Sequence, residues 1–130
     1  MSEILFQAHS GLRYLVLLAG IIALIFFGFG WATNRVRDSA SRIIGSAFVG
    51  LLDFQVLLGI GVVLTRPFYP ALSGHILMMV LAAMSAHLLV GKAMRGSPTD
   101  KRAFAMGAVG VLLALILIVG GIMSIGRSVV

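Results

Sequence analysis

The sequence contains no cysteine, and acidic side chains are scarce, with only 4 Asp and Glu among 130 residues. The lack of cysteine excludes disulfides, thiolate metal sites, iron–sulfur clusters and covalent attachment of a c-type haem. Charged residues of either sign make up 11% of the chain, whereas 60% of the residues are hydrophobic and the mean hydropathy is +1.11. This composition is far from that of a soluble globular domain and indicates an integral membrane protein.

Long apolar stretches dominate the rest of the chain. There are four of them, at Leu12–Ala32, Ile43–Leu64, Ala71–Val90 and Ala103–Ile125. Each has roughly the 20 residues that an α-helix needs to cross a hydrocarbon core about 30 Å thick. The connections between them are short, which favours neighbouring antiparallel helices. The sequence therefore predicts a single all-α domain over residues 1–130, a four-transmembrane-helix bundle in up-down-up-down order.

The basic residues are distributed unevenly between the two sides of such a bundle. Seven of the ten flank or lie in the connections 33–42 and 91–102: Arg35, Arg37, Arg42, Lys92, Arg95, Lys101 and Arg102. The positive-inside rule then puts both connections in the cytoplasm and both termini on the non-cytoplasmic side of the cell inner membrane. The net charge of +6 is thus a topology signal, and no nucleic-acid partner is expected.

Two histidines lie at equivalent places in this arrangement, His9 at the start of the first span and His75 at the start of the third. These two spans run in the same direction, so both imidazoles are predicted at the outer membrane face and at similar depth. An ionisable group inside a membrane protein indicates a functional site, because keeping it there costs free energy. Helices one and three are diagonal in a sequentially wound bundle, where cofactor sites are commonly built. We therefore expect His9 and His75 to be the two axial ligands of one haem b.

Arg13 follows His9 by one helical turn and lies on the same helical face. Its guanidinium is predicted to pair with a haem propionate, which would offset the cost of burying the charge. The alternative for the two histidines is an interfacial role, with hydrogen bonds to lipid head groups or water. The repeated position of a histidine on the first helix of each helical hairpin hints at an internal duplication.

His87 and Asp53 are additional candidate site residues. His87 is twelve residues beyond His75, hence about 18 Å deeper, and nothing on helix one can ligate at that depth. It is interpreted as half of a five-coordinate site, as a proton-handling or quinone-contacting group, or as a polar residue satisfied near Ser85. Asp53 lies near the bilayer midplane, where a carboxylate must be protonated, paired or facing water.

Several short segments resemble small four-helix bacterial membrane proteins described as cytochrome-b-like. The similar segments are His9-Ser10-Gly11-Leu12-Arg13-Tyr14, Gln55-Val56-Leu57-Leu58-Gly59, Gly74-His75 with Met78-Met79, and Ala86-His87. The resemblance covers most of the chain and implies a b-type haem. It also implies a histidine at the position of Asp53, where this chain departs from the pattern.

Two functions from different classes remain open at this point. The first is an electron-transfer protein with one b haem near the outer face, exchanging electrons with quinol or with other integral membrane subunits. The second is a cofactor-free accessory subunit of a larger membrane complex or homo-oligomer. A proton carrier that uses Asp53 is a third. No enzymatic activity is expected, since the sequence shows neither an activated nucleophile nor an open three-ligand metal site.

Overall fold

The computed structural model describes residues 2–33, 39–65, 70–95 and 101–125, and these are almost entirely helical. The helices are α1 (Ser2–Ala32), α2 (Ser39–Thr65), α3 (Ala71–Ser85), a π-helical turn η1 (Ala86–Val90), α4 (Gly91–Arg95) and α5 (Lys101–Ser124). Because α3, η1 and α4 follow each other without a break, they form one continuous rod. The described residues thus contain four long helical rods.

All four rods are long and apolar enough to cross a membrane, over Glu3–Ala32, Ala40–Thr65, Leu72–Val90 and Arg102–Ser124. The predicted all-helical fold, with four helices long and apolar enough to cross a membrane, is confirmed for the described residues. The first helix begins at Ser2, ten residues before the predicted span. Its first turns carry Glu3 and Gln7, whose side chains hydrogen-bond to each other at 3.0 Å and keep the hydropathy low there. His9 consequently lies about two turns inside α1 instead of at its leading end.

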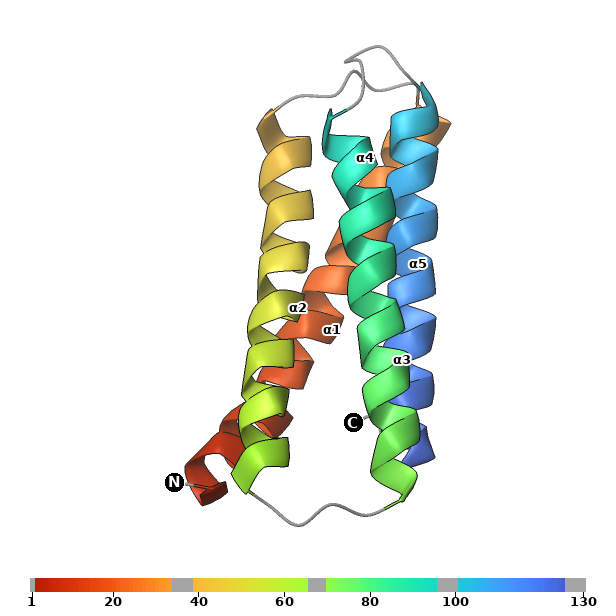
Figure 1. Cartoon of the computed structure of the whole chain (residues 1–130). Coiled ribbons are helices and arrows are strands. Elements are labelled where there is room, and N and C mark those ends of the chain that lie inside the picture. Colours follow the sequence, from red (N-terminus) through yellow and green to blue (C-terminus); the bar gives the residue numbers. More distant parts are fainter. Residues whose placement is uncertain (1, 34–38, 66–69, 96–100, 126–130) are drawn as a thin grey trace.

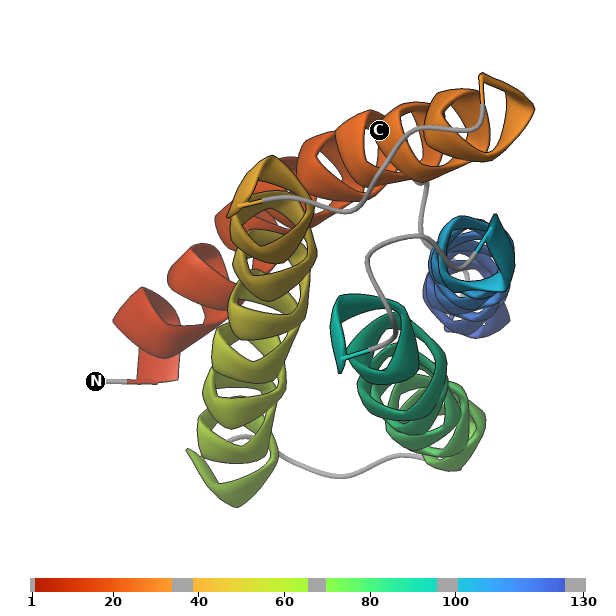
Figure 2. The same ribbon diagram turned by 90° about the horizontal axis from the view of Figure 1, so that it is seen from above.

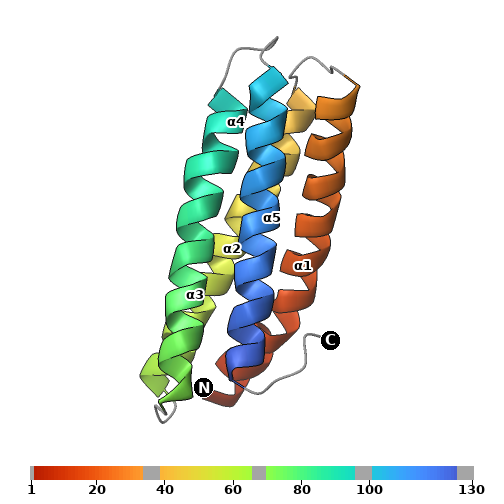
Figure 3. The ribbon, with the colours of Figure 1, turned by 90° about the vertical axis from the view of Figure 1, so that its right-hand side faces the viewer.

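The rods are arranged as two helical hairpins, α1 with α2 and α3–η1–α4 with α5 (Figures 1 and 2). Consecutive rods alternate in direction, so the start of α1 and the end of α5 lie at the same end of the bundle (Figure 3). The two hairpins join mainly where α1 packs along α5, whereas α2 and α3 touch only sparingly. The bundle is therefore tight on the α1–α5 side and loose on the α2–α3 side.

The centre of the bundle is filled by aromatic and branched side chains. Phe27, Phe48 and Phe104 are almost completely buried, and the ring centroids of Phe27 and Phe104 are 6.2 Å apart. The outer surface is apolar as well, with Leu64 79% exposed and Phe29 69% exposed. In water such a surface would cause aggregation, but in a bilayer it contacts lipid tails that are equally apolar.

Candidate functional site

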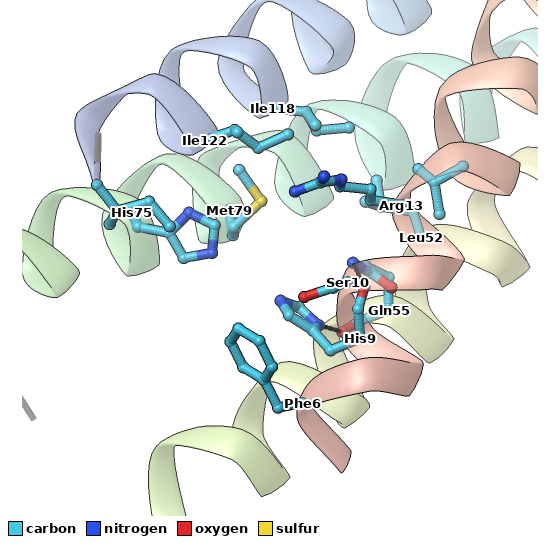
Figure 4. Close-up of a pocket in the computed structure, with 12 residues that line it drawn as sticks. Phe6, His9, Ser10, Arg13, Leu52, Gln55, His75, Met79, Ile118 and Ile122 are labelled. Atoms are coloured by element: carbon cyan, nitrogen blue, oxygen red, sulfur yellow. Dashed lines mark hydrogen bonds between the residues drawn. The ribbon is translucent and has the colours of Figure 1, made fainter. Parts of the chain in front are cut away.

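His9 of α1 and His75 of α3 face each other across the bundle near one end (Figure 4). Their ring centroids are 6.3 Å apart, and the two ring planes are nearly perpendicular, at 89°. A pocket opens beside the two rings, lined by Phe6, His9, Ser10, Arg13, Val16, Leu52, Gln55, His75, Met79, Ile118, Ile122 and Ile125. The structure thus brings together the two histidines that the sequence analysis paired.

Both imidazoles are held by backbone carbonyl groups of the neighbouring helix. The Nδ1–H of His9 donates to the carbonyl oxygen of Gln55 at 3.1 Å, and that of His75 donates to the carbonyl oxygen of Gly121 at 2.9 Å. A carbonyl only accepts hydrogen bonds, so each Nδ1 carries the proton and each Nε2 keeps its lone pair. Metal-binding histidines show this arrangement, in which the hydrogen bond fixes the tautomer and the ring orientation.

The two hairpins present their histidines in equivalent ways. In each hairpin the accepting carbonyl group belongs to the residue 46 positions after the histidine. Leu52 and Ile118, each three residues before the accepting residue, are both buried and both line the pocket. This correspondence extends the internal duplication suggested by the histidines alone, and it gives the pocket an approximate two-fold symmetry.

Arg13 breaks that symmetry, because Met79 occupies the corresponding place in the other hairpin. One guanidinium nitrogen, Nη2, donates to the hydroxyl of Tyr14 at 2.9 Å, and the guanidinium lies 4.8 Å from the centre of that ring. The Nε of Arg13 is buried without a hydrogen-bond partner, and so is the Oε1 of Gln55 in the same pocket. Buried polar atoms are nearly always satisfied, so these two atoms indicate that the pocket receives a polar group.

Gln55 and Gly59 fix the position of α1 against α2 at His9. The Nε2 of Gln55 donates to the carbonyl oxygen of His9 at 2.7 Å, so that the two residues exchange hydrogen bonds. A Cβ atom on Gly59 would lie only 3.0 Å from Cε1 of His9. The glycine therefore leaves the room that the imidazole needs at this close approach of the two helices.

Asp53 and His87 form a second cluster that the sequence analysis did not pair. The Nε2–H of His87 donates to the carboxylate of Asp53, at 2.7 Å from one oxygen and 3.0 Å from the other. Depth along straight helices gives His87 no ligand on helix one and offers Ser85 as a polar neighbour. Ser85 instead donates to the carbonyl of Leu81. The sequence feature that could have identified this pair is the carboxylate of Asp53 in the middle of the second span.

Neither a family model nor a curated protein nor a solved structure matches this sequence.

Proposed function

We propose that the protein is a membrane electron-transfer protein that binds one b-type haem through His9 and His75. The observation that carries this proposal is the pair of imidazoles whose Nδ1–H groups are engaged by the carbonyls of Gln55 and Gly121. The ring centroids are 6.3 Å apart, which would leave room for a metal ion between the two imidazoles at metal–nitrogen distances of about 2 Å.

The donor set favours a porphyrin over a bare metal ion. Among the described residues there is no group of three or more His, Cys, Asp or Glu side chains that would hold a metal. A single transition-metal ion usually takes four to six ligands, and two imidazoles leave most of these unfilled. A haem brings four nitrogens of its own and needs only the axial pair from the protein.

A bound haem supplies reversible one-electron chemistry, and the protein's own residues determine where and how it is held. His9 and His75 would ligate the haem iron, and the carbonyls of Gln55 and Gly121 orient the two rings. Arg13 offers the charge and the unpaired Nε that a propionate carboxylate would satisfy. Electrons are exchanged with quinol or with another protein in the membrane, because the described residues provide little surface beyond the spans.

An optical spectrum of the purified protein tests this proposal. The chain should be produced in cells with ample haem and extracted gently, and its spectrum recorded after oxidation and after reduction. We expect a sharp reduced-minus-oxidised α band and a haem-to-protein ratio close to one. A haem-replete preparation without this band, or one that holds copper at the two histidines in place of haem, contradicts the proposal. The first of these results would favour the cofactor-free accessory subunit.

Arg13→Leu is expected to retain the haem but to lower its reduction potential. Removing a cation close to the iron favours the more positive oxidised form, by roughly 1 to 2 kcal/mol, or tens of millivolts for a one-electron couple. A potentiometric titration followed at the α band measures the shift. Arg13→Lys keeps the charge and should remain close to the wild-type potential, so equal shifts in the two variants would show that the charge of Arg13 is not responsible.

A further inference from the structure

The pair of Asp53 and His87 lies well inside the membrane-spanning part of the bundle. Asp53 is in the middle of α2, and His87 follows His75 by twelve residues, about 18 Å along the helix. The side chain of His87 is 54% exposed and that of Asp53 is 45% exposed. At this depth the exposed atoms face lipid, so the pair is reached from the hydrocarbon phase, on the side where α2 and α3 touch sparingly.

A π-helical turn positions this histidine. The turn η1 covers Ala86–Val90 and interrupts an otherwise α-helical rod, which rotates the residues that follow relative to those before. Gly110 of α5 packs directly against it, and a Cβ atom there would lie 2.6 Å from Cβ of Leu89 and 3.2 Å from the backbone nitrogen of Val90. Single π-helical turns occur frequently at functional sites.

The hydrogen bonds of the pair determine what kind of ligand it can bind. Since the carboxylate of Asp53 accepts from Nε2–H, the other ring nitrogen of His87, Nδ1, is left as an acceptor. In the described part of the chain, no second polar group bonds to this imidazole. Asp53 fixes the tautomer and the orientation of the neutral imidazole, as the carboxylate does in carboxylate–histidine catalytic pairs. A ligand for this site therefore donates a hydrogen bond and dissolves in lipid.

We propose that Asp53 and His87 form the head-group site of a hydroquinone lipid, whose hydroxyl donates a hydrogen bond to Nδ1 of His87. A hydroquinone combines a hydroxyl donor with an apolar tail that keeps it in the bilayer. The oxidised quinone has only carbonyl acceptors, so it gains no hydrogen bond from the neutral imidazole. The role of the hydroquinone as electron donor rests on the proposed function, because the electrons would pass to the haem. Binding of the head group at Asp53 and His87 requires no haem.

Binding of a decyl-tailed benzohydroquinone to the full-length protein in lipid nanodiscs tests the proposal. With dithionite present, the ligand stays reduced, and nitrogen-15 spectra of the histidine rings report on His87 directly. We expect the reduced ligand to shift the Nδ1 signal of His87 and to bind about tenfold more tightly than the oxidised quinone. His87→Gln should weaken binding of the reduced ligand by about the same factor, while Ser85→Ala, two residues away in the same rod, should not.

Asp53 acts through His87 and is a positioning residue. Asp53→Asn should change the tautomer of His87 seen in the nitrogen-15 spectrum and weaken hydroquinone binding, and Asp53→Glu should restore both. Unchanged affinity in His87→Gln, equal affinity for the two redox forms, or binding of Zn²⁺ but not of hydroquinone at the pair would each overturn the inference. His75→Ala should still bind hydroquinone, whereas His87→Gln should still bind haem, so failures of the two proposals are distinguishable.

Discussion

Replacing either His9 or His75 by alanine is expected to abolish low-spin haem, the largest single effect predicted for this protein. In the proposed site each imidazole would supply one ligand to the haem iron, in the tautomer that a carbonyl on the neighbouring helix sets. The spectrum of the reduced protein should lose the sharp α band in both variants. Insertion should continue, because neither change alters the hydrophobicity of the spans appreciably.

The control for this experiment is His87→Ala. This variant removes a histidine of the same membrane span as His75, but from a different cluster, in which the partner is Asp53. Its haem spectrum should equal that of the wild type, and all three variants should show the same helical content by circular dichroism. Loss of the haem signal in His87→Ala, with retention in His9→Ala, would refute the assignment of the axial pair.

The fold could be predicted from the sequence because long apolar stretches mark the segments that are able to cross a membrane as helices. The start of the first helix was missed for the same reason, since the turn around Glu3 and Gln7 is helical but polar. The juxtaposition of His9 and His75 followed from alternating helix directions. Their roles as haem ligands remain a prediction.

The hydrogen bonds that hold the two imidazoles could not be predicted from the sequence. The carbonyls of Gln55 and Gly121 accept from the two imidazoles only because of the way the helices pack, and every residue carries a carbonyl group. The pairing of Asp53 with His87 was missed for a different reason. Counting 1.5 Å per residue assumes parallel, uninterrupted α-helices, whereas these helices are inclined to each other and the rod is interrupted at η1 (Figure 2).

Gly110→Ala is expected to have the second-largest effect, a loss of stability. The added methyl group would overlap atoms at or next to the backbone of η1, which cannot move aside as the end of a flexible side chain can. Its Cβ would lie 2.6 Å from Cβ of Leu89, an atom that cannot turn away without moving the helix backbone. Overpacking of this kind typically costs about 1 to 3 kcal/mol. We expect a lower unfolding temperature in detergent, loss of the hydrogen bond between His87 and Asp53 in nitrogen-15 spectra, and weaker hydroquinone binding. Haem should be retained, because His75 lies on the other side of the π-helical turn.

The matched control is Gly50→Ala in α2, where, apart from its two chain neighbours and the nearby backbone of α2 itself, no described atom lies within 4 Å of the added Cβ. Alanine is the better helix former by about 0.5 to 1 kcal/mol, so this variant should unfold at the same temperature as the wild type or slightly higher. The two substitutions are chemically identical, and only their surroundings differ. Gly110→Ala could instead unfold at the same temperature as Gly50→Ala and keep the hydrogen bond between His87 and Asp53. In that case the close approach of α5 to η1 does not maintain the π-helical turn. A separation of about 1 to 3 kcal/mol between the two variants assigns that role to the glycine.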